Sequence, residues 1–272
     1  MTIISREPDY RPEPETAFGR IGKIVLGTLE SVGHGLLILF HAFLDIRFAL
    51  SRLRRHEIAY QMYLTGIKSL PVITVVALFT GMILALQTGL ELRRFNQEVQ
   101  IGTAVTVSML REMGPFMTAL IIAAGVGSSI AAQLGTMTVS EEVAALEIMS
   151  ISPVKVLVMP RLVALMVMMP IMTVYTNVLG VAGGAVVGQT QLGVSMTGYF
   201  NNALVYAENK DLYVGLFKAA VFGVIIATVA CYQGFNARGG AVGVGHATRK
   251  TVVVSFLTIL VSGYIITRLF YV

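Results

Sequence analysis

The chain has 272 residues, of which 55% are hydrophobic and 13% are charged, and its mean hydropathy is +0.76. This composition is typical of an integral membrane protein and excludes an ordinary soluble domain. The formal net charge of +5 is compatible with nucleic-acid binding, but the basic residues concentrate beside apolar segments, around residues 47–55 and 249–250, where they indicate anchoring to anionic lipid headgroups. We therefore expect membrane lipid and no nucleic acid as a partner.

The N-terminal part of the chain differs from the rest. Residues 1–17 are polar and rich in proline, which predicts a loose cytoplasmic tail. Residues 18–60 form an elbow region, in which charged residues, histidines and glycines interrupt the apolar stretch 24–50. We interpret this stretch as an amphipathic helix in the cytoplasmic membrane interface, with a true span as the alternative. Residues 61–272 then form the membrane domain.

Later segments of the chain are long and apolar enough to cross a bilayer, which takes about 20 residues. The five candidates are residues 69–90, 102–126, 156–187, 212–231 and 252–269. Nine lysines and arginines precede the first candidate, so the positive-inside rule places the N-terminus in the cytoplasm and the C-terminus outside. The fold class is therefore an all-α integral membrane protein with five transmembrane helices.

An acidic, amphipathic segment at residues 139–149 lies between the second and third spans, on the cytoplasmic side. Thr138 or Ser140 can cap a helix there, and the acidic residues after them favour its positive N-terminus. A helix this short is marginal alone, so we predict that it docks on a partner protein. An ordinary connecting helix is the alternative. The predicted docking residues are Glu141, Glu142, Val143, Leu146, Glu147 and Met149.

Two groups of glycines stand out. Gly180, Gly184 and Gly188 repeat every four residues in the third span and predict a ridge that another helix approaches closely, either within the chain or at a subunit interface. The glycine-rich run at residues 239–245 follows a membrane helix and lacks the Gly-Lys-Ser/Thr of a phosphate-binding loop, so we assign it to a flexible cytoplasmic turn. The chain itself is therefore not expected to bind ATP.

Charged residues stand inside two spans: Arg111 and Glu112 in the second and Lys218 in the fourth. A charge in the bilayer costs about 2.5–3.5 kcal/mol on insertion scales, so such groups face a partner or a wet cavity. The helical rise puts Glu112 roughly 15 Å and Lys218 roughly 9 Å from the outer ends of their helices, close enough to pair. Arg111 would then be a positive charge in excess of the Glu112–Lys218 pair, and a lipid phosphate could neutralise it. A purely structural ion pair is the alternative.

Several motifs, taken in order, resemble those of the MlaE/YrbE permeases of lipid-handling ABC transporters. They include LREMGP at residues 110–115, GVGS at 125–128, EE at 141–142 with ALEIM at 145–149, SP at 152–153, and PR at 160–161. Gly81-Met82, Leu86-Gln87, Lys218 and residues 247–252 extend the similarity. The resemblance covers nearly everything from about Gly66 to the C-terminus.

The resemblance implies a homodimeric inner-membrane permease with an interfacial N-terminal helix and five spans. It also implies two partner proteins: a cytoplasmic P-loop ATPase that binds ATP and Mg, and a periplasmic MCE-domain lipid-binding protein. A small cytoplasmic STAS-type accessory protein is a further partner that the resemblance allows. By motif, the coupling helix falls on Glu141 to Met149. The implied lipid path comprises Leu84, Gln87, Leu92, Phe95, Arg111, Glu112 and Lys218.

Two other functions remain open from the sequence. Glu112 and Lys218 could form the proton relay of a secondary carrier, which inverted repeats would support, but no convincing repeat is visible. A non-transporting membrane scaffold would need no polar cavity. The four histidines are scattered without metal-ligand spacing, and no catalytic constellation can be placed, so the chain is not expected to be an enzyme or to bind a cofactor or metal.

Overall fold

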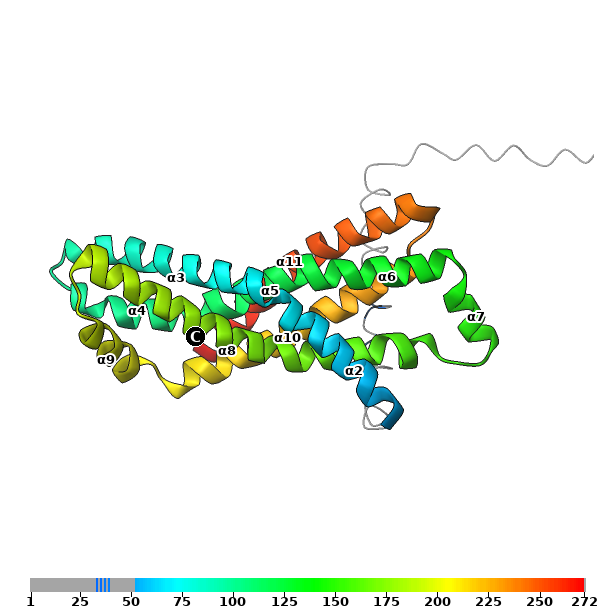
Figure 1. Ribbon diagram of the computed structural model, residues 1–272, viewed down its shortest axis with the longest axis horizontal. Helices are drawn as coiled ribbons and strands as arrows, with labels where there is room; N and C mark the ends of the chain where they lie inside the picture. Colours follow the sequence, from blue (N-terminus) through cyan, green and yellow to red (C-terminus); the bar gives the residue numbers. More distant parts are fainter. Residues whose placement is uncertain (1–32, 34, 36, 38, 40–51, 272) are drawn as a thin grey trace, which may run out of the picture.

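The computed structural model describes residues 33, 35, 37, 39 and 52–271. The predicted polar tail and most of the interfacial elbow helix lie outside these residues. Every regular element in the described part is helical (Figure 1). Five helical stretches there are long and apolar enough to cross a membrane: Arg55–Arg93, Glu98–Val139, Val154–Leu192, Asn209–Phe235 and Gly240–Tyr271. The five predicted spans are confirmed, and each helical stretch extends beyond both ends of the segment predicted from the sequence.

The spans are built from several helices. The first comprises α2 (Arg52–Thr65), a 3₁₀ turn and α3 (Leu70–Arg93). The second comprises α4 (Ile101–Ser108), α5 (Gly114–Ile122) and α6 (Ser128–Val139), joined by π-helical turns at Met109–Met113 and Ala123–Gly127. The others are α8 (Met159–Leu192), preceded by a π-helical turn at Val154–Val158, α10 (Asn209–Phe235) and α11 (Gly240–Tyr271).

Two short helices mark the opposite ends of the bundle. The segment between the second and third spans contains α7 (Glu142–Ile148), and α9 (Met196–Tyr206) connects the third and fourth spans. In Figure 1 the two lie at opposite ends of the long axis, α9 beside α4 and α7 beyond α6. We call these the α9 end and the α7 end. Sequence reasoning missed α9, although Ser195 accepts a hydrogen bond from the Gly198 N–H as an N-cap.

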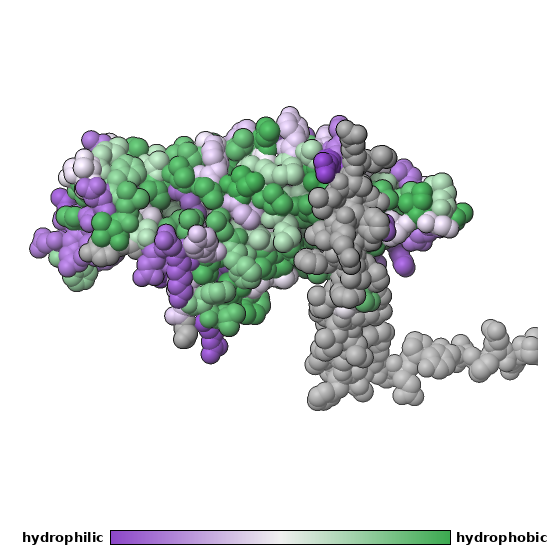
Figure 2. All heavy atoms as spheres, turned by 90° about the horizontal axis from the view of Figure 1, so that it is seen from below, coloured by the Kyte–Doolittle hydropathy of each residue, from purple (hydrophilic) through white to green (hydrophobic). Residues whose placement is uncertain are grey.

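The third span forms the centre of the bundle. In its most apolar window 61% of residues are buried, against 22% in the first and fifth spans, and α8 packs on both α3 and α10. The apolar outer faces of α3 and α11 carry side chains such as Phe79 and Val261. Figure 2 shows a largely hydrophobic surface along the middle of the molecule, with hydrophilic residues gathered toward both ends. This pattern fits a bilayer around the middle of the bundle.

The glycine ridge of the third span packs inside the chain. Gly180, Gly184 and Gly188 are all buried in α8. A Cβ added to Gly81 of α3 would lie 1.8 Å from the Gly180 carbonyl oxygen, and one added to Gly184 would lie 2.6 Å from the Tyr199 hydroxyl of α9. Because this chain already covers the ridge, its interpretation as a subunit interface is wrong, and the intramolecular alternative is confirmed.

The glycine-rich run at residues 239–245 is mostly helical, so its assignment to a flexible turn is wrong. Only Gly239 and Gly240 have the positive φ angles (86° and 69°) of a turn, and α11 begins at Gly240. Gly243 serves close packing, because a Cβ there would lie 1.8 Å from the Arg238 carbonyl oxygen. The chain therefore reverses in a tight turn and enters the fifth span directly.

Candidate functional site

The candidate site begins with a π-helical turn in the second span. Met109–Met113 is wound wider than an α-helix, and the N–H of Gly114 bonds to the Met109 carbonyl. In an α-helix the Arg111 carbonyl would accept from residue 115, but Pro115 has no N–H. The Arg111 carbonyl therefore needs a donor from elsewhere. Gly114 leaves no space for a side chain, because a Cβ there would lie 1.8 Å from Asn177 Oδ1.

Lys218 supplies that donor. Its Nζ lies 2.8 Å from the Arg111 carbonyl oxygen, 2.6 Å from Glu112 Oε1 and 2.7 Å from Thr267 Oγ1 of α11. These three acceptors use all three ammonium protons, and the side chain is fully buried. Gly215 lets α10 come this close, because a Cβ there would lie 2.1 Å from the Leu110 carbonyl oxygen. The predicted proximity of Glu112 and Lys218 is confirmed.

Arg111 has its own partner, which sequence reasoning missed. Its Nε and Nη2 donate to the two carboxylate oxygens of Asp211, at 2.6 and 3.1 Å, and the Tyr271 hydroxyl donates to the same carboxylate at 2.8 Å. The guanidinium also lies 4.5 Å from the centre of the Tyr271 ring. The expectation of an unmatched positive charge at Arg111 is therefore wrong, because Asp211 neutralises it in a bidentate pair.

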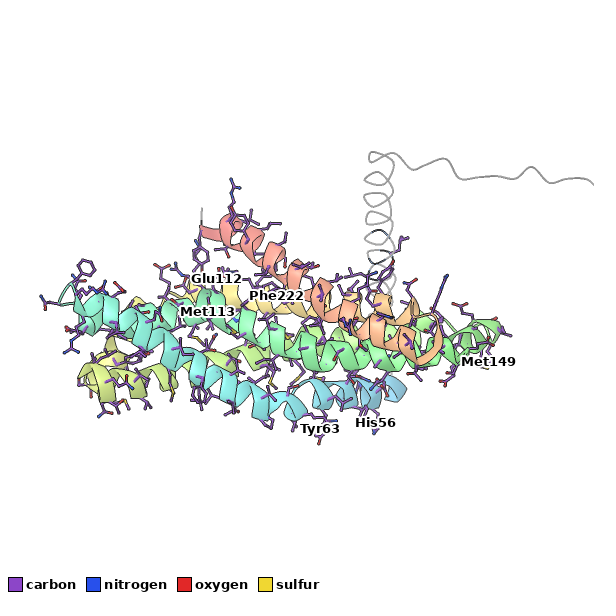
Figure 3. All side chains as sticks on the ribbon, turned by 90° about the horizontal axis from the view of Figure 1, so that it is seen from above. His56, Tyr63, Glu112, Met113, Met149 and Phe222 are labelled. Carbon is purple, nitrogen blue, oxygen red and sulfur yellow. The ribbon has the colours of Figure 1, made fainter. Side chains whose placement is uncertain are left out.

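We call these six residues the charged cluster: Arg111, Glu112, Asp211, Lys218, Thr267 and Tyr271. Its two cations and two anions sum to zero. Asp211 and Lys218 are fully buried, whereas the side chains of Glu112 and Arg111 are 41% and 37% exposed. In Figure 3 Glu112 lies next to the C-terminal part of α11. The cluster is thus sealed on the α10 side and open on the side of the second span.

The other residues of the predicted lipid path lie apart from these charges. Leu84 and Leu92 of α3 are half-buried and pack against the core around Val105 and Met109. Gln87 is exposed, and Phe95, in the turn after α3, is 72% exposed. Met109 belongs to the same π-helical turn as Arg111, so the apolar packing around Leu84 and Leu92 reaches that turn.

The predicted docking segment forms a helix, but its cap differs from the prediction. Thr138 belongs to α6, and the Ser140 hydroxyl donates to the Thr136 carbonyl and to Glu142. Glu141 occupies the N-cap position with a left-handed backbone (φ 62°) and no side-chain cap. The proposed cap at Thr138 or Ser140 is therefore wrong.

The outward face of α7 also differs in part from the prediction. Val143 and Leu146 are half-buried, and Glu141, Glu142 and Glu147 are exposed. Met149 is 60% exposed, and Ile148, which sequence reasoning did not select, is 85% exposed. In Figure 3 Met149 lies at the far end of the molecule from Glu112. The segment presents acidic and apolar side chains together at the α7 end.

Comparison with known proteins identifies the family of the chain. A family model described as permease MlaE matches residues 58–269. The chain belongs to the MlaE permease family. This membership and the five spans make it a multi-pass membrane permease rather than a catalytic subunit. The matched region contains α7 and every residue of the charged cluster except Tyr271.

Individual relatives agree with the MlaE assignment. A probable ABC transporter permease protein of Rickettsia felis is 40% identical over 251 residues, which cover 92% of this chain and 96% of the relative. The intermembrane phospholipid transport system permease protein MlaE of Haemophilus influenzae is 30% identical over 256 residues, with the same shares covered. The chloroplast protein TRIGALACTOSYLDIACYLGLYCEROL 1 of Arabidopsis thaliana is 31% identical over 211 residues, which cover 78% of this chain and 60% of that protein.

Proposed function

We propose that this chain is the membrane subunit of an ATP-driven transporter that moves phospholipid between the inner membrane and a periplasmic carrier. Its MlaE family membership and the names of its relatives as ABC transporter and phospholipid transport permeases support this function. The observation that carries the proposal is the half-open charged cluster in an otherwise apolar bundle. It offers a phosphate-binding group beside surfaces suited to acyl chains.

The contacts in the cluster divide its residues by role. Lys218 has no proton left for a ligand, so it acts as a positioning residue that holds the π-helical turn in place. Arg111 has a 37% exposed side chain, and its guanidinium has five N–H donors, of which Asp211 takes two. The remaining donors suit a lipid phosphate, while Leu84, Gln87, Leu92 and Phe95 extend the path for the rest of the lipid. The same saturation of Lys218 disfavours a proton relay.

The partners follow from the two ends of the bundle. We place the α7 end in the cytoplasm, where its acidic and apolar side chains dock on a P-loop ATPase that binds ATP and Mg. Two copies of the chain would present two such helices to two ATPase subunits. The α9 end then faces the periplasm and an MCE-domain lipid-binding protein. A small STAS-type protein is a further cytoplasmic partner that the family allows.

A purification followed by photocrosslinking tests this function. The tagged chain carries a photocrosslinker at Phe95 or, as control, at Val261, which is 60% exposed on α11. We expect a P-loop ATPase to co-purify in detergent. When the purified protein is irradiated after detergent has replaced the bilayer lipid around Val261, phospholipid should be captured at Phe95 well above the level at Val261. Purification without an ATPase, or equal capture at both positions, would contradict the proposal.

A further inference from the structure

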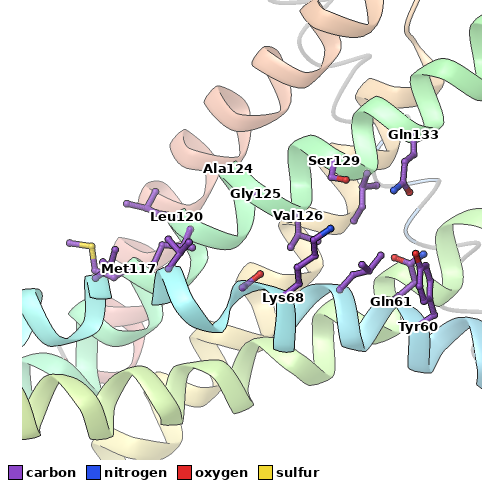
Figure 4. A pocket seen from close by; sticks show the side chains of 16 residues that line it. Tyr60, Gln61, Lys68, Met117, Leu120, Ala124, Gly125, Val126, Ser129 and Gln133 are labelled. Atoms are coloured by element: carbon purple, nitrogen blue, oxygen red, sulfur yellow. The ribbon is translucent and has the colours of Figure 1, made fainter. Parts of the chain in front are cut away.

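A second polar feature lies between the first and second spans, away from the charged cluster. A cavity of about 840 Å³ opens there, within the size range of ligand pockets (Figure 4). One wall comes from α2 and the start of α3, and the other from α5, the second π-helical turn and α6. Gly125, midway along the lining residues of the second span, follows Glu112 by 13 residues, so the centre of the cavity lies roughly 20 Å from Glu112 along that span, toward the α7 end.

The cavity is polar at one end and apolar at the other. Tyr60 and Gln61 on the first span and Ser129 and Gln133 on the second lie toward the α7 end, as Figure 4 shows. The two spans are antiparallel, so the apolar lining residues gather at the opposite end. These are Val72, Val76, Met117, Leu120 and Ile121. Such a gradient matches a molecule with a polar headgroup and an apolar chain.

The charge of the cavity is positive. Lys68 is the one charged residue among the sixteen that line it, and none of the lining residues is acidic. Within the described part of the chain, Lys68 has no carboxylate at ion-pair distance. Gln133 Oε1 accepts from Arg161, which leaves the Gln133 amide N–H groups as further donors. The Gln61 amide already donates to Glu57, which does not line the cavity. The groups that the polar end offers to an anion are therefore the Lys68 ammonium and the Gln133 amide.

We propose that this cavity binds a phospholipid with an anionic headgroup, drawn from the membrane leaflet on the α7 side. The headgroup lies against Lys68 and Gln133, and one acyl chain runs between Val72 and Leu120. The proposal rests on the proposed function only for calling that leaflet cytoplasmic, because the preference for an anionic lipid follows from the lining alone. The cavity is thus a separate lipid site from the charged cluster.

The absence of tryptophan from the chain gives a direct test. The variant Val72→Trp places one fluorescent probe in the cavity, where Val72 is 55% exposed, and Val261→Trp places one on the exposed face of α11 as control. Full-length protein is reconstituted in vesicles that contain brominated phosphatidylglycerol or brominated phosphatidylcholine, which quench tryptophan on contact. At Val72→Trp we expect half-maximal quenching at a roughly fivefold lower fraction of the anionic lipid. The control shows no preference.

A lysine substitution assigns the preference to the cavity. Adding Lys68→Met to the Val72→Trp variant abolishes the preference, whereas adding Lys250→Met, an exposed lysine on α11, preserves it. If Val72→Trp fails to fold, Leu120→Trp reports from the opposite wall. A preference that survives Lys68→Met would overturn the proposal. So would its loss on adding inorganic phosphate at constant ionic strength, which would indicate a site for free anions.

Occupation by a second copy of the chain is the other alternative. Quenching by neither lipid, together with a disulfide that links two copies of the Val72→Cys variant through the introduced thiols, would show that the second copy fills the cavity and would overturn the proposal. The test is independent of transport. Selective quenching without an associated ATPase would refute the proposed function alone, and ATP-driven lipid transfer without selective quenching would refute this site alone.

Discussion

The charged cluster and the α7 segment are both rich in charge, but they use it in opposite ways. In the cluster, Arg111 pairs with Asp211 and Lys218 with Glu112, at N···O distances of 2.6 Å. In the α7 segment, Glu141 and Glu147 have no cation at ion-pair distance within the described residues, and the apolar Ile148 is 85% exposed. The cluster finds its partners inside the chain, and α7 presents its groups to something else.

This difference predicts where substitutions act. A group whose partners are internal stabilises the fold, so its loss lowers the free energy of unfolding. Replacing a group that is exposed and unpaired changes the free energy of unfolding little, so the effect appears in assembly with a partner protein. Comparing stability with coupling in the same variants therefore separates the two regions.

The largest effect is expected at Glu112. The variant Glu112→Met leaves the fully buried Lys218 without its carboxylate, and we expect a loss of about 3–5 kcal/mol in the free energy of unfolding. Lys218→Met should lower the free energy of unfolding by less, about 1–3 kcal/mol. Glu112 is 41% exposed and can be hydrated by water, so the main loss is the hydrogen bond from Lys218 to the Arg111 carbonyl. Unfolding with sodium dodecyl sulfate in mixed micelles measures both values.

The double variant decides whether the pair has a second role. Glu112→Met with Lys218→Met should recover much of the stability lost in Glu112→Met, because no unpaired charge remains. Poor lipid transfer by this stable double variant would support a lipid path at the cluster, and wild-type transfer would leave the pair purely structural. Glu91→Met, which removes an exposed pair with Arg94, serves as the control and should change stability little. Equal losses in the two single variants would contradict the asymmetry.

A smaller effect is expected at the contact between α3 and α8. Gly81→Ala would put a methyl group 1.8 Å from the Gly180 carbonyl oxygen, so the helices must separate at a cost of about 1–3 kcal/mol. Gly245→Ala in α11 is the matched control, because a Cβ there meets nothing within 4 Å, and it should stabilise the helix by roughly 0.5–1 kcal/mol. The same detergent titration compares them. Opposite signs are expected, and a neutral Gly81→Ala would exclude close packing at this ridge.

The sequence predicted the five spans and the Glu112–Lys218 contact because both follow from local rules. Long apolar runs identify helices in a membrane, and a buried charge needs a counter-charge at similar depth. Asp211 was missed because it stands just before an apolar run and looks like a loop residue. A usable signal existed: Asp211 precedes Lys218 by seven residues, nearly two helical turns, which puts both on the same face of α10.

The glycines show where such rules stop. The run at residues 239–245 is poor in helix propensity, yet α11 begins inside it and continues into buried positions such as Ala247 and Thr251. Tertiary packing outweighs the cost of about 1 kcal/mol for each helical glycine. Likewise, spacing alone could not tell whether the Gly180 ridge packs within the chain or between subunits, because the choice depends on where Gly81 and Tyr199 lie.

The smallest effect on stability is expected at α7, where the effect on function should be complete. The double variant Glu141→Lys, Glu142→Lys changes exposed side chains. Among the described residues, their one side-chain hydrogen bond is the one that Glu142 accepts from the Ser140 hydroxyl, so the free energy of unfolding should change by less than about 0.5 kcal/mol. If α7 docks on the ATPase, reversing both charges separates ATP hydrolysis from lipid transfer, because like charges then face the groove.

Three measurements make this prediction specific. Cysteines at Glu142 and on the ATPase surface should crosslink in the wild-type background, and Ile148→Ser, which removes an 85% exposed apolar side chain, should weaken ATPase association without loss of stability. Charge reversal by Glu91→Lys at the α9 end, where the side chain is also exposed, should leave coupling intact. Normal assembly and transfer in the Glu141→Lys, Glu142→Lys variant would make α7 an ordinary connecting helix. Of the two regions, the charged cluster alone would then have a role that follows from contacts within the chain.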